Sequence, residues 1–564
     1  MLTTKSRFAT RRLALCLGAA AIALATAQPS RAADKAACDP YENYSCLDAA
    51  LGTGFWERLL NYYKLEMGHD AAPADPNAPP GRDGWPTTPE TVPPMPFTEW
   101  PYGGTTSLGV NRTGSIDSPL MAAISNTHLG NWMSDNGLQF YGWVDPGFNV
   151  SSNSLRPGGN APIAYAYTPN TVQLDQFVLY FERTPDTVQT DHIDWGFRVS
   201  GIYGENYRYT TSFGLVSNQL LKNNDVNGYD FPMLYGEVYI PQIAEGLMIR
   251  AGRYISLPDI EAQLAPNNYM YTHSMTYSFD NYTNTGVQAT LAVNKNLMLQ
   301  LGVSVGTEAP VWHLSAQETN YLPRLPASAG FGNVANPLYS GRTFQKDPGA
   351  QPTLTACVRY DWNDGRDDTN ICANGINDGR WGYNNLQWYG ATYYHKWNDQ
   401  WHISAESYYM QEYRIPNNQN AEAEYIYQNG GTPFSPQYLP FNAPAPVYCK
   451  DGASLKCTAT AIGAVSYLNY TPDHLNNFSF RPEYYYDPNG WRTGTGVPSF
   501  YYSVSLGWQH WLSPQIEFRP EIGYYRSLGV KAFNGGPSNT GTGGATPGPA
   551  NYTVFGGGDV IMHF

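Results

Sequence analysis

The sequence predicts an all-β fold, a transmembrane antiparallel β-barrel of about 16 strands within a range of about 14 to 18. Three observations predict it. The N-terminus has the pattern of an export signal, alternating strands of transmembrane length recur over more than 400 residues, and the chain ends on an aromatic residue. In a barrel of this kind, short turns join the strands on the periplasmic rim and long loops join them on the extracellular rim.

Residues 1–27 form the predicted signal peptide. Basic residues, of which Lys5 is the first and Arg12 the last, precede an apolar run at 13–27 that ends in small residues suited to cleavage. After this segment, no apolar run reaches the roughly 18 residues that a membrane-spanning helix needs. A helical membrane protein is therefore excluded.

The composition suits a surface that faces lipid. Charged residues make up 14% of the chain, against about 25% in average soluble domains, and aromatic residues also make up 14%, with 44 Tyr and 15 Trp. Barrels carry such residues in girdles at the membrane interfaces. A secreted all-β protein that handles sugars can share this composition. The formal net charge of −14 argues against nucleic acid as a partner.

The seven cysteines predict disulfides in an oxidising compartment. One lies in the signal, and the other six fall into neighbouring pairs. None shows the C-x-x-C spacing of a metal site, so local disulfides are the favoured interpretation. The predicted pairs are Cys38 with Cys46, Cys357 with Cys372, and Cys449 with Cys457.

Residues 28–136 are predicted to be a small pre-barrel segment. A helix is expected at 47–66, and the stretch 71–101 holds ten prolines, which predicts a linker or an extended arm. Its task is not readable from the sequence, and whether it plugs the barrel stays open. The outer-membrane barrel is predicted to occupy 137–564.

The barrel strands are recognised by their two faces. One predicted strand places Ile193, Trp195 and Phe197 on one face and Asp194 and Arg198 on the other. A soluble sandwich also allows such alternation. The number of strands that repeat it, together with the signal and the chain end, favours a barrel, whose strands need about 9 to 11 residues to cross the membrane.

The final strand completes this pattern. Val560, Met562 and Phe564 alternate with Ile561 and His563. A membrane barrel needs a last strand that pairs with the first, so that no edge stays open. We expect Phe564 to be the barrel-closing terminus, and the C-terminal strand to be the part that the barrel-assembly machinery binds.

The connections between strands are uneven. Tight connections at 294–296 and 398–400 are expected to be periplasmic turns. Long connections at 307–383, 415–461 and 529–551 are expected to be extracellular loops. Two of the three cysteine pairs fall within these long stretches.

Short motifs along the barrel region indicate a family. The opening stretch 142–147 (GWVDPG), Gly252-Arg253, 285–287 (TGV), 481–483 (RPE) and 519–521 (RPE) occur in order over about 420 residues. In this order they resemble the putative beta-barrel porin type 2 family, the OmpL-like outer-membrane proteins. The resemblance implies a pore-forming barrel in the bacterial outer membrane with an unassigned solute, and it supplies no catalytic residues.

Charged residues on the predicted inward faces are candidates for the pore lining. In a water-filled channel, walls of Arg opposite carboxylates would set a transverse field that selects solutes by size and charge. The alternative is a salt-bridge ladder that stiffens the wall without touching solute. The candidates are Arg198, Glu237, Arg250, Glu406, Arg481, Glu483, Glu517, Arg519 and Glu521.

Two further stretches carry charged residues. The segment 256–282 could fold inward as a constriction loop, with Asp259 and Glu261 near Arg253, or it could be an ordinary extracellular loop. The acidic run at 361–368 could hold Ca²⁺ through oxygen ligands, or it could be a solvated tip, which its glycine position favours.

The sequence therefore predicts an outer-membrane porin that conducts small hydrophilic solutes by passive diffusion, with a weak preference for cations. It is expected to contact outer-membrane lipid and to need no cofactor, metal or catalytic residue. The alternatives are a secreted soluble β-protein that binds or hydrolyses polysaccharide, and an outer-membrane barrel that acts as an adhesin through its loops. The transported solute and the oligomeric state stay open.

Overall fold

The structure is a computed structural model that describes most of the barrel region and a short N-terminal helix. The predicted signal and the Cys38–Cys46 pair lie outside the described residues. The described residues are 51–67 and 118–564, except 126, 157, 213–215, 217, 222–224, 256–258, 282, 308–321, 338–351, 378–385, 430–446, 474, 514 and 536–547.

One antiparallel sheet of 18 strands dominates the described structure. A separate two-stranded hairpin, β9 (Arg324–Leu325) with β10 (Val334–Ala335), lies outside it. The strands of the large sheet are β1 (Leu138–Ser151), β2 (Val172–Arg183), β3 (Asp194–Gly204), β4 (Gly228–Asp230), β5 (Leu234–Ile240), β6 (Leu247–Ile255), β7 (Thr283–Ala292), β8 (Leu297–Thr307), β11 (Thr353–Trp362), β12 (Asp367–Ile376), β13 (Gln387–Lys396), β14 (Trp401–Pro416), β15 (Lys456–Asp473), β16 (Asn476–Asp487), β17 (Ser499–Ser513), β18 (Ile516–Phe518), β19 (Glu521–Ser527) and β20 (Tyr552–His563).

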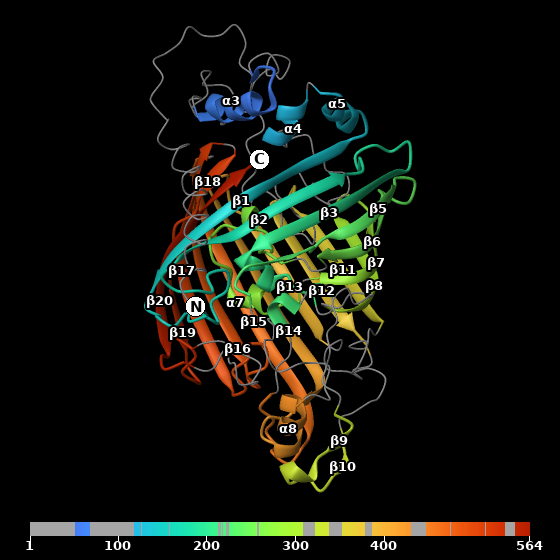
Figure 1. Ribbon diagram of the computed structural model, residues 1–564. Coiled ribbons are helices and arrows are strands. Elements are labelled where there is room, and N and C mark those ends of the chain that lie inside the picture. Colours follow the sequence, from blue (N-terminus) through green and yellow to red (C-terminus); the bar gives the residue numbers. More distant parts are fainter. Residues whose placement is uncertain are drawn as a thin grey trace.

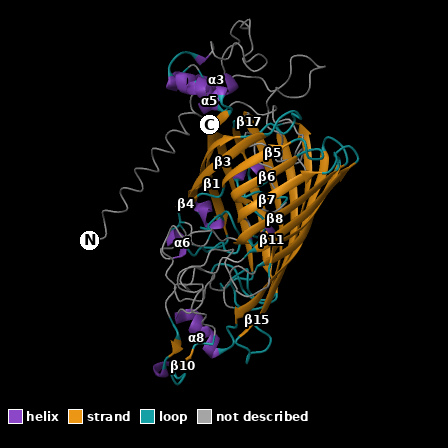
Figure 2. Cartoon of the chain, turned by 90° about the vertical axis from the view of Figure 1, so that its right-hand side faces the viewer, coloured by secondary structure: helices purple, strands orange, loops and turns teal. Residues whose placement is uncertain are grey.

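The sheet closes into a barrel of 16 strands, as predicted. β4 and β5 are two halves of one interrupted strand, because both pair with β3. β18 and β19 are likewise one strand, because both pair with β17 and with β20. β1 pairs with β20, which leaves no open edge. Figures 1 and 2 show the tilted strands running around the closed wall.

The alternation read from the sequence sorts residues between the two faces of this wall. Ile193 and Trp195 are 60% and 54% exposed on the outer face, whereas Asp194 and Arg198 are 7% and 3% exposed. This arrangement, with apolar side chains outside and charged side chains inside, is the reverse of the one found in soluble domains. This is the arrangement expected of a wall whose outer face is solvated by lipid.

The barrel closes at Gly142 and Phe564. The Phe564 amide donates to the Gly142 carbonyl at 2.9 Å, and the Gly142 amide donates to the Phe564 carbonyl at 3.0 Å. The Phe564 ring stacks on Phe177 with 5.7 Å between centroids. Position 142 needs glycine, since a Cβ there would lie 2.0 Å from the Val178 carbonyl oxygen.

The two rims differ as predicted, with one correction. The turns at 294–296 and 398–400 join β7 to β8 and β13 to β14 on the short-turn rim. The stretch 307–383, predicted as one long loop, instead contains β11 and β12, joined by a tight turn at 363–366. β12 (DDTNICANGI) was missed because it carries few apolar residues on its outer face, whereas the outer face of β11 is apolar, with Leu354, Val358 and Tyr360 exposed.

Two predicted disulfides are present. Cys357 in β11 forms a disulfide with Cys372 in β12, so this bond joins two neighbouring strands of the barrel wall and does not lie within a loop. Cys449 pairs with Cys457 and ties the start of β15 to the chain that precedes it.

A small helical group lies on the short-turn rim beside the chain's C-terminal end (Figure 1). It consists of α3 (Phe55–Met67), α4 (Pro119–Ile124) and α5 (His128–Asp135). The buried Arg58 side chain joins α3 to α4 by donating to the Ala122 carbonyl at 2.8 Å. The Tyr63 hydroxyl donates to the His563 carbonyl, which joins the helices to the barrel. Residues 47–50 of the helix predicted at 47–66 lie outside the described residues, and α3 begins at Phe55, after Gly52, whose φ is +92°.

The other helical elements lie in the connections between strands. None of the described helices is both long and apolar enough to cross a lipid bilayer. These elements are η2 (Glu205–Tyr209), α6 (Asn218–Leu221), η3 (Ala265–Asn267), α7 (Met275–Ser278), η4 (Ala327–Ala329) and α8 (Ala421–Asn429).

Candidate functional site: the barrel interior

A segment between β6 and β7 folds into the barrel. We call residues 259–281 the inward segment. Nearly all of its residues are buried, although it is a connection between strands and contains little regular structure. Its α7 packs against β15 and β16, which are far from β6 and β7 in the order of strands around the barrel. The connection therefore occupies the interior and does not extend away from the rim.

Arg481 in β16 is the main contact between the wall and this segment. Its guanidinium is fully buried and donates to Thr272 Oγ1 at 2.9 Å, to Glu521 Oε1 at 3.1 Å and to the Tyr467 hydroxyl at 3.2 Å. Glu261 Oε1 lies 3.7 Å from the same guanidinium. Thr272 also donates its amide to Glu521 at 2.7 Å. One arginine thus joins two carboxylates from different parts of the chain to the backbone of the segment.

Two wall carboxylates accept hydrogen bonds from the segment's backbone. Glu483 in β16 accepts from the Thr276 amide at 2.6 Å and from the Ser503 hydroxyl at 2.8 Å. Glu406 in β14 accepts from the Ile260 amide at 3.0 Å. The Ile260 amide lies outside helices and strands, and the Thr276 amide lies in the first turn of α7. Neither has an acceptor within regular structure, and these carboxylates supply one.

Arg519 and Glu517 lie where the β18–β19 strand is interrupted. Arg519 pairs with Asp559 in β20, with 3.0 Å between Nε and Oδ1, and donates to the Asn268 carbonyl at 3.0 Å. Glu517 accepts from the Gln509 amide group at 2.7 Å. Arg519 therefore binds the inward segment, and Glu517 belongs to a hydrogen-bond pair within the wall.

Three other predicted residues form a ladder in the wall. Arg198 pairs with Glu182 at 2.6 Å, and Arg250 pairs with Glu237 at 2.7 Å. The Tyr235 ring lies between them, 5.9 Å from the Arg198 guanidinium and 4.1 Å from that of Arg250. This arrangement resembles the stiffening ladder that the sequence left as an alternative.

Arg253 has other partners than those predicted. It donates to both carboxylate oxygens of Asp230 at 3.0 Å and to the Thr210 carbonyl at 2.6 Å. Glu261, expected near it, pairs with Arg481. Arg253 lies in β6 before the inward segment begins, and its side chain is bound by the neighbouring wall and the β3–β4 connection.

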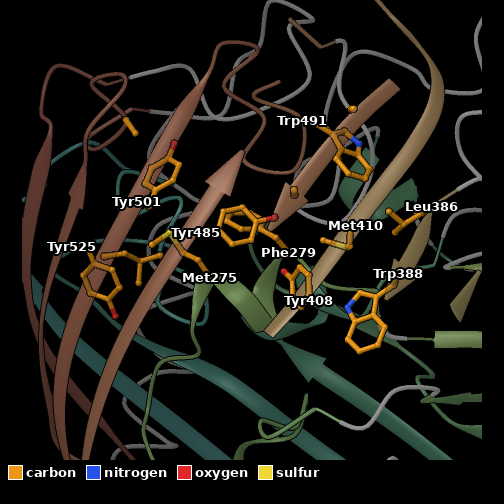
Figure 3. Packing of buried hydrophobic residues seen from close by; sticks show 14 of the residues in the cluster. Met275, Phe279, Leu386, Trp388, Tyr408, Met410, Tyr485, Trp491, Tyr501 and Tyr525 are labelled. Carbon is orange, nitrogen blue, oxygen red and sulfur yellow. The ribbon is translucent and has the colours of Figure 1, made fainter. Parts of the chain in front are cut away.

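The inward segment also has an apolar side. Met275 and Phe279 belong to a buried cluster with Trp388, Tyr408 and Tyr485 from the wall. Figure 3 shows Met275 and Phe279 lying among these rings. The Tyr408 hydroxyl donates to the Thr276 carbonyl at 2.5 Å. Apolar packing and hydrogen bonds together hold the segment against β13 to β16.

The interior carries a surplus of negative groups. Among the described residues, nineteen Asp and Glu side chains are buried, against nine Arg, of which Arg58 belongs to the helical group and eight to the barrel. Burial raises the pKa of Asp259, and the neighbouring charge of Asp280 raises it further. Burial likewise raises the pKa of Asp280, followed by the charge of Glu406. The described barrel residues therefore bury more carboxyl groups than arginines.

Some interior residues were missed by reading the sequence. Arg492 donates to the Phe279 and Asp280 carbonyls at 2.6 and 2.7 Å, and its position in a connection gives no periodic signal. Asp145 and Asp559 are buried wall carboxylates. Both lie on inward faces of alternating strands, so periodicity could have identified them.

The acidic run at 361–368, for which Ca²⁺ binding was the less favoured interpretation, does not converge on one point. Asp368 pairs with Arg359 inside the barrel. Asp367 pairs with His395 at 2.6 Å, and Asp364 is exposed on the turn. The carboxylates are divided between two faces because the run spans a hairpin turn rather than a loop.

Comparisons with known proteins place the chain in a family. Residues 137–564 match the family described as "Putative beta-barrel porin-2, OmpL-like". No curated protein matches the chain significantly.

Solved structures with similar folds include outer-membrane proteins of three bacteria. The outer membrane channel DcaP of Acinetobacter baumannii is 10% identical, with 76% of this chain and 97% of that chain covered and a TM-score of 0.42. The anion-selective porin from Comamonas acidovorans is 8% identical, with coverage of 76% and 99% and a TM-score of 0.42. Outer-membrane expressed OmpT of Vibrio cholerae is 10% identical, with coverage of 76% and 97% and a TM-score of 0.37. Values this low say nothing about solute or selectivity.

Proposed function

This chain belongs to the OmpL-like family of putative beta-barrel porins, and from that premise we propose that it lets small hydrophilic solutes diffuse passively across the bacterial outer membrane. The observation that carries the proposal is the inward segment, bound to charged residues of a closed 16-strand wall. A barrel of this size is wide enough to hold an aqueous channel. The segment narrows that space, and its own polar groups become part of the lining.

We assign the predicted pore-lining residues to two roles. Arg481, Glu483, Glu406, Arg519 and Glu521 hold the inward segment in place and set the width of the passage, because each contacts it directly. The remaining residues stiffen or polarise the wall. This second group comprises Arg198, Glu237 and Arg250 in the ladder, Glu517 beside Gln509, and Arg253 beside Asp230.

Selectivity follows from the charge balance of the interior. The surplus of buried carboxylates over arginines lowers the free energy of a cation inside relative to an anion. We therefore propose a preference for cations and for neutral polar solutes of small radius.

The outer face supports a location in lipid rather than in water. Trp195 and Leu301 are 54% and 66% exposed on it, as are many other apolar wall residues. Exposed apolar side chains on so many strands disfavour a secreted soluble protein that binds polysaccharide. β20, with Phe564 at its end, is the strand that we propose the barrel-assembly machinery binds, as in the sequence prediction.

Liposome swelling tests this function. Vesicles that contain the folded chain are diluted into isotonic solutions of neutral sugars of increasing size. Swelling that is fast for the smallest sugar and declines steeply with size is expected of a passage narrowed by the inward segment. Folding is checked by the change in electrophoretic mobility on boiling. A chain that shows this change but no swelling with any solute would refute diffusion.

A further inference from the structure

Three carboxylates converge where the two ends of the inward segment meet the wall. Asp259 begins the segment, Asp280 lies at its end, and Glu406 projects from β14. One oxygen of each lies within 4.8 Å of the others. The side chains belong to residues that are only 8%, 0% and 3% exposed. Among the described residues, these three acidic side chains lie close enough together to surround one metal ion.

Each of these three carboxyl groups has a buried oxygen without a hydrogen-bond donor. Asp259 Oδ1, Asp280 Oδ2 and Glu406 Oε1 accept no hydrogen bond from the described residues. Asn281, the next residue, is also fully buried, and neither its side-chain oxygen nor its side-chain nitrogen forms a hydrogen bond within the described residues. Arg492 donates to the backbone carbonyls of Phe279 and Asp280. A buried carboxylate oxygen without a donor is costly, and three of them together repel one another.

We propose that Asp259, Asp280 and Glu406 bind one divalent cation of the Ca²⁺ class. Ca²⁺ takes six to eight oxygen ligands at about 2.3–2.6 Å. Two such bonds span about 4.6–5.2 Å, so oxygens that lie up to 4.8 Å apart can share one Ca²⁺ without rearrangement. Mg²⁺, at about 2.0–2.1 Å, spans only about 4.2 Å. Asn281, which follows Asp280 in the sequence, carries a further buried side-chain oxygen without a hydrogen-bond partner among the described residues.

Such an ion would join both ends of the inward segment to β14. Ile260 already donates its amide to the second oxygen of Glu406, so the start of the segment is fixed at this point of the wall. Arg492 fixes the end of the segment through its two carbonyl contacts. The cation completes this attachment and neutralises the charges that oppose it.

Protons compete with the cation for the same oxygens. The charged groups around Asp259 and Asp280 are each other, Glu406, Glu261 and Arg492. Carboxylates must lose their protons to bind metal. The Ca²⁺ titration is therefore made at a single fixed pH.

Calorimetric titration of the folded full-length barrel with CaCl₂ in detergent tests the site. One Ca²⁺ per chain is expected at pH 7.5. Asp280→Asn and Glu406→Gln each remove a charged ligand and are expected to weaken binding by about tenfold or more. Asp364→Asn is the matched control, because it makes the same chemical change on the exposed turn. It should bind Ca²⁺ as the wild type does.

A second measurement needs no variant. The urea midpoint of the wild-type barrel should rise when Ca²⁺ replaces EDTA, because a ligand that binds only the folded state stabilises it. Absence of both binding and a midpoint shift in the wild type would overturn the site. So would unchanged binding in both Asp280→Asn and Glu406→Gln.

Discussion

Replacing Arg481 by Met should release the inward segment while leaving the wall closed. Arg481 is fully buried and is joined to Thr272, Glu521, Tyr467 and Glu261. Removal of one partner from a buried ion pair costs about 3–5 kcal/mol of folding free energy, because it leaves an uncompensated charge. Glu521 keeps two hydrogen bonds from Thr272 at 2.6 and 2.7 Å. We therefore expect a loss near the lower limit, about 3 kcal/mol.

The matched control is Arg359→Met. Arg359 is also a buried cation on the inward face of the barrel, and it pairs with Asp368. Its hydrogen bonds within the described residues go to Asp368 and to the Met298 sulfur, not to the inward segment. It should lose a similar amount of stability, because it leaves the buried Asp368 carboxylate without its cation.

Two assays separate the variants. Urea unfolding monitored by tryptophan fluorescence should give comparable losses for both. Planar bilayer recording should show a larger and noisier single-channel conductance for Arg481→Met, whereas Arg359→Met should keep the wild-type step. The reasoning is refuted if Arg481→Met keeps the wild-type step, or if both variants change it equally.

Three further predictions address charge, closure and disulfides. Without Ca²⁺, the preference for cations should fall and the stability of the fold should rise as the pH is lowered from 8 to 5. The reason is that Asp259 and Asp280 have raised pKa values, so the folded state binds more protons than the unfolded state. A reversal potential and a urea midpoint that stay flat down to about pH 4, the ordinary carboxyl range, would contradict this. Phe564→Ala removes the ring stacked on Phe177 and should destabilise the closed barrel by about 1 kcal/mol; an unchanged fraction of heat-modifiable barrel and an unchanged urea midpoint would count against it. Replacing Cys357 and Cys372 together by Ala should lower stability by about 3 kcal/mol, since the bond closes a chain separation of 15 residues. The conductance should stay unchanged, because β11 and β12 remain hydrogen-bonded along their length. Loss of the conductance step would show that the disulfide shapes the passage.

The fold could be predicted because each outer face repeats a simple pattern. Ile193 and Trp195 face outward while Asp194 and Arg198 face inward, and this alternation depends only on neighbours in the sequence. β12 was missed because its outward residues include Thr369 and Ala373, which do not contrast with its polar inward residues. A strand with a weakly apolar outer face is identified by its partners, and these are not visible locally.

The interior was predicted in part. Alternation identified which charges face inward, including Arg481 and Glu483, but not what they contact. The partners of Arg481 include Thr272, some 209 residues earlier in the chain. Docking of a connection into a barrel depends on such long-range complementarity, so the sequence left the segment 256–282 as either a constriction or an extracellular loop.

Single-channel recording of the purified, refolded chain across a salt gradient tests the central claim most directly. Discrete conductance steps are predicted, with a reversal potential whose sign reports cations as the preferred ions, because carboxylates outnumber arginines in the interior. A barrel that is shown to be folded but gives no steps would contradict the porin function. Steps with an anion-selective reversal potential would contradict the assignment of selectivity to the interior carboxylates.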